Sequence, residues 1–181
     1  PNGTEAVLID FPGTYSIYPT ASDEKIAAAV LTNPTDVFYP DVVLYIADVN
    51  HLEKHLLLLT QLLDLGFPVV MALNMCDVAE AQGIKFNATR LGEKLKIPVV
   101  PISGRTGYNL PKLLAELEKS ASQATDKKGT TTTTTSSFYT LTDTEKQVAE
   151  AVRLNLGIEH PYRALLVAHH HAWLPNLQNS D

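Results

Sequence analysis

The sequence predicts an α/β fold, with a mostly parallel sheet covered by helices on both faces and a small helical subdomain after it. Short apolar runs alternate with helix-like segments along most of the chain. The apolar runs are continuous rather than alternating, which is typical of parallel strands that are buried on both faces. Turn residues follow each run, so we expect the turns to gather on one rim of the sheet.

The composition limits the class of protein. A chain of 181 residues with 45% apolar residues is expected to form one compact domain, or one domain with an appendage. The net charge of −6 argues against nonspecific binding to a nucleic-acid backbone. The single cysteine, Cys76, excludes an internal disulfide framework and a cysteine-only zinc site. No apolar run is long enough to span a bilayer and no signal peptide is evident, so we expect a soluble chain.

Four apolar runs are the expected strands, and each leads into residues that favour a turn. After the first run, Pro12 and Gly13 oppose any further strand or helix. The second run ends in Asp48, which we expect to cap the following helix. The expected strands are Ala6–Ile9, Val42–Asp48, Val69–Leu73 and Ile97–Ile102.

Helices are expected between and after these strands. The second helix has a broad apolar face and is closed by Gly66, a typical C-terminal cap. Asn87 is a good N-cap, and Pro111 suits a first helical turn. The expected helices are Asp23–Val30, Leu52–Leu65, Asp77–Gln82, Asn87–Leu95 and Leu110–Leu117.

The last third of the chain changes character. Six consecutive threonines lie in a stretch with almost no apolar residues, which indicates a linker or an exposed loop. Two helices are expected after it, over Leu141–Leu156 and Tyr162–Trp173. We therefore predict an α/β domain over residues 1–119, a Thr/Ser-rich linker or loop over 120–138 and a helical subdomain over 139–181.

The end of the third strand carries residues suited to a guanine base. The Asp77 carboxylate can accept two N–H bonds at once, and guanine offers two such donors on its Watson–Crick edge. Asn74 could contact the base and also brace the loop, and Met75 could lie over the base plane. The alternative is an ordinary strand end followed by an Asx-type turn.

Three rim motifs stand in a fixed order along the chain. Asp10-x-x-Gly13 follows the first strand, Asn74-x-x-Asp77 the third and Ser103-Gly104-Arg105 the fourth. Each motif is weak alone, but together they resemble the later half of a Ras-like P-loop GTP-binding domain. An ordinary turn is the alternative for Asp10 and Gly13.

The residues within and between these motifs are similar to those of one family in particular. DFPGTYS, the stretch from ADVNHLEKHL to NMCD, and IPVVPISGRTG resemble the cytosolic G domain of the bacterial ferrous iron transport protein B family. The resemblance covers Val7 to about Leu117, and Tyr139–Trp173 resembles more loosely the helical region that follows the family's G domain. It implies GTP and GDP as ligands, with Mg²⁺.

The resemblance also implies roles for the site residues. Asp10 would hold Mg²⁺ through a water, and the Gly13 amide would meet the γ-phosphate. The pair Asn74 and Asp77 would read guanine, with Met75 between them, while Ser103 and Gly104 would form the loop that supports the base. Gly104 stands where the family usually has Ala, and because the amide is kept we expect no loss of function.

One departure from the family lies upstream. The phosphate-binding motif G-x-x-x-x-G-K-[ST] and the switch threonine that should precede Asp10 do not occur in the 181 residues. We therefore expect the chain as given to bind nucleotide poorly and to be inactive, and the natural protein to begin before Pro1. If the chain were whole, its sheet would expose a central edge, and we would expect a homo-oligomer rather than a clean monomer in size-exclusion chromatography.

Hydrolysis is expected to be slow even in the intact domain. Many G proteins place a water-orienting Gln directly after D-x-x-G, and here that position is Thr14. The water would then be positioned by backbone groups or with the help of K⁺. The suggestion of K⁺ rests on the resemblance alone.

Other polar residues favour structural roles. Cys76 is expected to be a buried filler rather than a reactive thiol, because nothing basic adjoins it. The histidines His51 and His55 have the i, i+4 spacing of some metal pairs but no evident third ligand, so a solvated face is favoured. His169 to His171 are consecutive, and consecutive helical residues point in different directions, so they cannot all bind one ion.

Two classes of function remain open from the sequence. The first is a GTPase switch on the cytoplasmic face of the bacterial inner membrane, which acts on its own transmembrane domain and regulates ferrous iron uptake. The second is an interaction module, a truncated or degenerate G fold that binds no nucleotide. Within the first class, a GTPase of another Ras-like family that acts on RNA is opposed by the acidic charge and the lack of a basic appendage.

Overall fold

The computed structural model describes residues 5–22, 24–126 and 137–174. The chain divides into two compact units. One unit is formed by Pro1–Tyr39 together with Lys146–Asp181, and the other by Pro40–Glu145. Each unit is described by itself.

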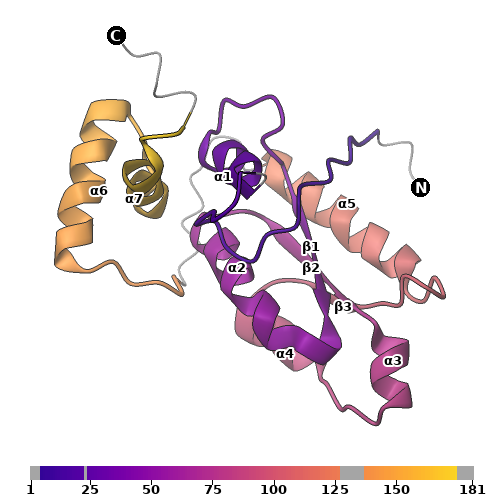
Figure 1. Ribbon diagram of the computed structural model, residues 1–181. Helices are drawn as coiled ribbons and strands as arrows, with labels where there is room; N and C mark the ends of the chain where they lie inside the picture. The colour runs from indigo at the N-terminus through magenta and orange to yellow at the C-terminus, as the bar shows by residue number, and fades with distance from the viewer. Residues whose placement is uncertain (1–4, 23, 127–136, 175–181) are drawn as a thin grey trace. The chain divides into compact units, whose positions relative to one another are not determined.

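The second unit contains a parallel sheet of three strands, in the order β1-β2-β3 (Figure 1). The strands are β1 (Val43–Asp48), β2 (Val69–Asn74) and β3 (Val99–Pro101). Val43 is paired with Val69, and Met71 with Val99. Five of the six β2 residues are buried, as expected for a central strand. The predicted α/β fold with a parallel sheet is therefore confirmed.

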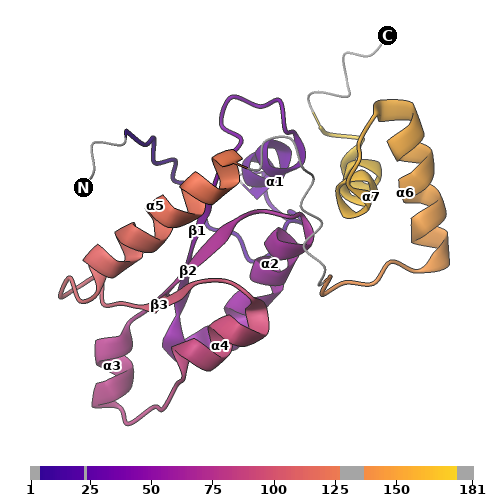
Figure 2. The same cartoon turned by 180° about the vertical axis from the view of Figure 1, so that it is seen from behind.

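Helices cover both faces of this sheet (Figures 1 and 2). On one face, Val70, Ala72 and Val100 form a buried cluster with Leu113 of α5 (Leu110–Asp126). On the other face lie α2 (Leu52–Asp64) and α4 (Ala88–Leu95). The period of two along each strand sends neighbouring side chains to opposite helices, which explains why β2 is apolar without interruption.

The ends of these helices form as the sequence predicted. Gly66 lies in the left-handed region, with φ of 81°, and its amide donates to the Leu63 carbonyl while the Phe67 amide donates to the Leu62 carbonyl. This pair of bonds is the Schellman motif, which satisfies the last carbonyls of α2. At the start of α4, the Asn87 side chain accepts a hydrogen bond from the Arg90 amide at 2.8 Å.

Gly92 fixes how closely α4 approaches the sheet. A Cβ at this position would lie 2.9 Å from the Ile97 carbonyl oxygen and 3.5 Å from Cγ2 of Val99. The first distance is too short for any side chain, and a backbone oxygen cannot rotate away. The glycine inside this helix is therefore required by packing, which offsets its low helix propensity.

Helix α5 is longer than the sequence predicted. We expected a helix over Leu110–Leu117 and a linker from residue 120, but α5 continues to Asp126. Ala121, a strong helix former, favours this continuation. The Ser122 hydroxyl bonds within the helix, to the Glu118 carbonyl at 2.9 Å. The rest of the linker, residues 127–136, lies outside the described residues. The three domain boundaries stay a prediction.

A buried carboxylate ties the segment before α6 to the end of α2. Asp64, the last residue of α2, accepts hydrogen bonds from the Phe138 amide at 2.6 Å and from the Tyr139 amide at 2.9 Å. Asp64 itself is buried. A negative charge is unfavourable at a helix C-terminus, and these two amide donors offset that cost.

Three further helices are α1 (Glu24–Thr32), α6 (Asp143–Leu156) and α7 (Pro161–His170), and the short helix α3 (Cys76–Ala81) follows β2. Helix α6 begins with a capping box. The Thr142 hydroxyl accepts from the Glu145 amide, and the Glu145 carboxylate accepts from the Thr142 amide at 2.7 Å. Both expected C-terminal helices are thus present, although α7 ends three residues earlier than predicted.

The predicted strand over Ala6–Ile9 is wrong. These residues belong to the first unit and form no helix or strand. Val7 is 88% exposed and Leu8 is 85% exposed. An apolar run becomes a strand only when a neighbouring strand accepts its backbone hydrogen bonds, and in the described residues this run has no such partner.

His170 is a buried titratable group of the first unit. Its Nε2 donates to the Ile17 carbonyl at 3.1 Å, and its ring contacts Tyr18, His169 and Trp173. Burial lowers the pKa of the His170 imidazole, and the neighbouring His169 lowers it further, whereas the bond to Ile17 acts in the opposite direction. The ring is therefore held neutral in the folded protein at neutral pH.

We expect the first unit to lose stability as the pH falls from about 7.5 to about 5.5. The pKa of His170 is lower in the folded state than in the unfolded state, so the unfolded state binds the proton first, near the ordinary pKa of about 6.5. His160, whose pKa is also lowered by burial, acts with the same sign. Urea unfolding at several pH values checks this. His170→Gln should remove part of the pH dependence, and the matched exposed change His171→Gln should leave it intact. An unchanged profile in His170→Gln would contradict the prediction.

Candidate functional site

The carboxyl end of β2 places Asn74 and Asp77 on the rim of the sheet. Asn74 is the last residue of β2 and Met75 has a left-handed backbone, with φ of 66°. This turn leads directly into α3 (Cys76–Ala81), so Asp77 lies in the first turn of that helix. Met75 is 38% exposed at the turn between them.

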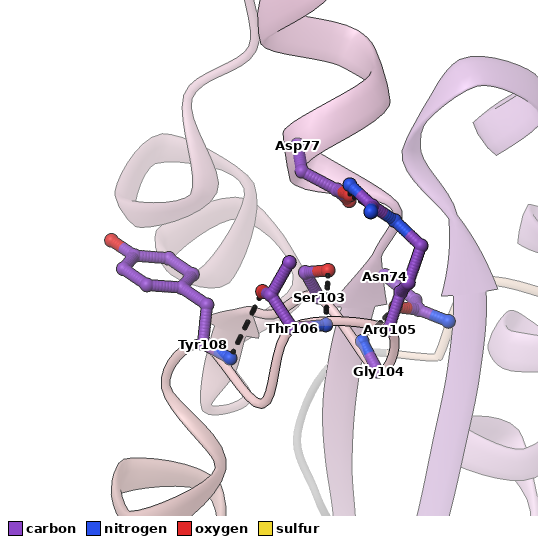
Figure 3. Close-up of polar contacts among 7 residues, drawn as sticks. All are labelled: Asn74, Asp77, Ser103, Gly104, Arg105, Thr106 and Tyr108. Atoms are coloured by element: carbon purple, nitrogen blue, oxygen red, sulfur yellow. Dashed lines mark hydrogen bonds and ion pairs between the residues drawn. The ribbon is translucent and has the colours of Figure 1, made fainter.

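The loop after β3 is a compact turn over residues 103–108 (Figure 3). The Gly107 amide donates to the Ser103 carbonyl at 2.9 Å, and the Ser103 amide donates to the Tyr108 carbonyl at 3.4 Å. The buried Ser103 hydroxyl accepts from the Thr106 amide at 3.3 Å. These bonds fix the loop locally, before any contact with α3.

Asn74 joins the two motifs. Its Oδ1 accepts a hydrogen bond from the Gly104 amide at 3.0 Å, across thirty positions of sequence (Figure 3). The Ile102 amide donates to the Leu73 carbonyl at 2.8 Å beside it. The Asn74 side chain is therefore bonded to the neighbouring loop, which disfavours a plain Asx turn at the end of β2.

Gly104 leaves room for a small side chain. A Cβ there would lie 3.7 Å from Oδ1 and 3.8 Å from Nδ2 of Asn74, which are ordinary contact distances. An alanine would fit without displacing Asn74. The glycine is thus compatible with the same loop geometry.

Asp77 forms an ion pair with Arg105 across the rim (Figure 3). The Nε and Nη2 atoms of Arg105 both donate to Oδ2 of Asp77, at 3.0 Å and 2.6 Å. Arg105 lowers the pKa of the Asp77 carboxyl, the Ser103 hydroxyl lowers it further, and burial opposes both. The carboxyl is therefore ionised at neutral pH and acts only as an acceptor.

Four predicted site residues are thus brought together: Asn74, Asp77, Ser103 and Gly104. Asp10 and Gly13 are exposed and belong to the other compact unit, so their place with this group stays a prediction. Thr14 is close to them in sequence, and its hydroxyl donates to the Ser16 carbonyl at 2.7 Å.

Two neighbouring residues have the structural roles that the sequence favoured. Asp48 lies in register with Asn74, but its Oδ1 accepts from the Asn50 amide at 2.8 Å as the cap of the short helix η1 (Val49–His51). Cys76 is buried, its thiol donates to the Leu73 carbonyl at 3.1 Å, and burial raises the pKa of that thiol.

Arg105 is the site residue whose role the sequence did not reveal. It is part of the Ser103-Gly104-Arg105 motif, but its pairing with Asp77 depends on two strand ends that lie far apart in the chain. No local pattern encodes that contact. The signal that could have found it is topological, because parallel strands place their following loops side by side.

The rim as a whole offers an ionised carboxylate, a side-chain amide and an exposed thioether around one loop. A carboxylate with two acceptor oxygens matches a planar group that presents two adjacent N–H donors. Such a set can bind and select a planar base through hydrogen bonds. The chemistry of this part of the site is therefore recognition.

Comparison with known proteins decides the family. The sequence model for ferrous iron transport protein B matches residues 1–117, which is more than half of the chain. The chain belongs to the ferrous iron transport protein B family.

Curated relatives with this name support the same assignment. An Fe(2+) transport protein A/Fe(2+) transporter FeoB fusion protein of Porphyromonas gingivalis is 44% identical over 110 residues, which are 61% of this chain and 13% of the relative. The Fe(2+) transporter FeoB of Staphylococcus aureus is 40% identical over 111 residues, or 61% of this chain and 16% of the relative. The chain thus spans about a sixth or less of the length of each of these two relatives.

Solved structures of ferrous iron transport protein B domains share the fold. The cytosolic domain of L. pneumophila FeoB matches with a TM-score of 0.66 and 27% identity, over 95% of this chain and 69% of that chain. The FeoB G-domain of Methanococcus jannaschii matches with a TM-score of 0.58 and 32% identity, over 63% and 70%. An S. thermophilus NFeoB variant bound to GDP matches with a TM-score of 0.65 and 28% identity, over 90% and 58%.

The sheet and its helices are accordingly those of a ferrous iron transport protein B G domain, which has the Ras-like P-loop GTPase fold. In the ranges of the chain that the structure describes, no helix combines the length and the apolar character that crossing a membrane requires.

Proposed function

We propose that this chain is the GTP-binding and GTP-hydrolysing cytosolic domain of a ferrous iron membrane transporter, in which bound nucleotide regulates Fe²⁺ uptake. The observation that carries the proposal is the hydrogen bond from the Gly104 amide to Asn74 Oδ1 at 3.0 Å. It holds the N-x-x-D strand end and the 103–108 loop together, with Asp77 at their junction. Family membership and a structural neighbour bound to GDP support the same ligand.

In this proposal the rim reads the guanine base. The two oxygens of Asp77 accept from the N1–H and the exocyclic amino group of guanine, a pair that adenine lacks. Asn74 keeps its bond to Gly104 and presents its amide group beside the base. Met75, 38% exposed, covers one face of the ring. Ser103 and Gly104 form the loop beneath it.

The phosphates and Mg²⁺ would be sensed by the D-x-x-G segment. Asp10 is an exposed carboxylate, and Mg²⁺ commonly keeps its waters and binds proteins through one or two carboxylates together with phosphate oxygens. A single carboxylate that binds Mg²⁺ through a water is consistent with this coordination. The amide of the exposed Gly13 would contact the γ-phosphate. Mg²⁺, when bound, neutralises the phosphate charge. A role for K⁺ rests on the family resemblance alone.

Hydrolysis in this proposal is slow. The Thr14 hydroxyl, at the position where many G proteins carry a water-orienting Gln, donates to the Ser16 carbonyl at 2.7 Å. It also accepts from the Ser16 amide at 3.3 Å. The same hydroxyl also contacts Oε1 of Glu24 at 3.4 Å. Because these contacts occupy the short Thr14 side chain, we do not expect it to position an attacking water.

The partner of the switch would be the transmembrane domain of the same transporter. The proposal places the chain at the cytoplasmic face of the bacterial inner membrane, where the order of nucleotide-sensing loops would act on the membrane-embedded part. This arrangement follows the transporter names of its curated relatives.

Titration of the natural polypeptide with a fluorescent GDP analogue, followed by displacement with GDP and with ADP, tests the proposal. A site that hydrogen-bonds the base should prefer GDP over ADP by about 100-fold or more. Equal displacement by both, or no binding of either, would contradict the proposal. That result would favour an interaction module that no longer binds nucleotide.

A further inference from the structure

The carboxylate proposed to read guanine already has a partner within the chain. Both recorded donor atoms of Arg105, Nε and Nη2, converge on the same oxygen, Oδ2 of Asp77 (Figure 3). The Asp77 carboxylate also contacts the Ser103 side chain. Arg105 thus takes the position of a ligand with two N–H donors, which is also the pattern that a guanine base presents.

The base and Arg105 cannot both use this oxygen. A carboxylate oxygen has two lone pairs, and the two N–H groups of Arg105 occupy both on Oδ2. Guanine needs one oxygen for N1–H and the other for its amino group. Binding of the base in that orientation therefore requires Arg105 to release at least one of its two bonds.

The Arg105 side chain can move away from Asp77. Its side chain is 77% exposed, whereas that of Asp77 is 22% exposed. Among the residues that the structure describes, Asp77 is the ion-pair partner of the Arg105 guanidinium. The long side chain can turn into solvent without disturbing the loop, because the bonds that fix the 103–108 loop come from the backbone and from the hydroxyls of Ser103 and Thr106.

We propose that Arg105 is an internal competitor of the guanine base: it holds Asp77 in the nucleotide-free protein, and so lowers the affinity for GDP. This inference rests on the proposed function of the rim. Arg105 acts through Asp77 and is a positioning residue. Its effect is the opposite of a supporting role, since removal of Arg105 should strengthen binding.

The test is the affinity of the natural polypeptide for a fluorescent GDP analogue, in the wild type and in Arg105→Gln. We expect Arg105→Gln to bind about two- to fivefold more tightly, the factor typical of an exposed ion pair. Arg105→Lys, which keeps the charge, should restore affinity close to that of the wild type. The matched control is Lys112→Gln, which removes one exposed positive charge outside the loop and should change the affinity little.

The salt dependence of the GDP affinity is a second measurement, and it would not change in this way if Arg105 only supported the structure of the loop. Added NaCl screens an exposed ion pair, so the ratio of affinities between Arg105→Gln and the wild type should fall towards one between about 0.05 M and 0.5 M. Lys112→Gln should show a ratio near one at every salt concentration.

The outcomes separate the two proposals. If the wild type prefers GDP over ADP and Arg105→Gln binds as the wild type does or more weakly, the competitor role is overturned and the guanine site stands. If the wild type shows no preference for GDP, the guanine site fails, and the competitor role fails with it. Tighter binding by Arg105→Gln, reversed by Arg105→Lys and reduced by salt, supports the inference.

Discussion

Asp77→Asn is expected to lower the affinity for GDP by about 100-fold and to shift the preference towards xanthosine diphosphate. The change replaces two acceptors with one acceptor and one donor, while size and shape stay the same. The new amide donor would face the guanine amino group, and that clash of donors is relieved in xanthine, which carries a carbonyl at the same position. Competition of GDP and xanthosine diphosphate against a fluorescent GDP analogue measures the shift.

A matched control separates recognition of the base by Asp77 from the effect of losing one negative charge. Glu80 lies on the same short helix, is exposed, and loses the same negative charge in Glu80→Gln. That variant should keep the GDP affinity of the wild type within about twofold, because its carboxylate is solvated. If Asp77→Asn also kept the GDP preference, the assignment of Asp77 to the base would be wrong.

The largest expected effect on stability comes from Asp64→Ala. The change removes a buried carboxylate that accepts from the Phe138 amide at 2.6 Å and the Tyr139 amide at 2.9 Å. Hydrogen bonds to charged groups contribute about 1.5–3 kcal/mol each, and the amides left behind must find water. We expect the free energy of unfolding to fall by about 2–4 kcal/mol, as measured by urea denaturation.

Two further variants make this prediction specific. Asp64→Asn keeps one acceptor oxygen and should cost clearly less than Asp64→Ala. Glu93→Ala removes an exposed acid from α4 and should change the unfolding free energy by no more than about 0.5 kcal/mol. A loss in Asp64→Ala no larger than in Glu93→Ala would show that the contact with residues 138 and 139 adds nothing to stability.

Features encoded within a few residues were predicted from the sequence. The Asn87 cap and the Gly66 C-terminal cap both formed, because each is a hydrogen-bonding pattern local to one helix end. The central strand β2 was equally clear, since a run buried on both faces must be apolar throughout.

Features that depend on distant partners were not predicted. The run Ala6–Ile9 is as apolar as a strand, but nothing in those residues says whether a neighbouring strand is present. The ion pair between Asp77 and Arg105 and the contacts of Asp64 join residues far apart in the chain. Such pairs follow from the topology, and the sequence of either partner alone does not specify them.

The order of the sheet also has a consequence for how the protein folds. β2 is the partner in both strand pairings, of Val43 with Val69 and of Met71 with Val99. A folding intermediate that contains a native strand pair of this sheet therefore contains β2. Each pairing also closes a loop of chain that includes a helix, and closing that loop costs conformational entropy. Residues 69–74 therefore lead into the rim at Asn74 and also link the two outer strands of the sheet.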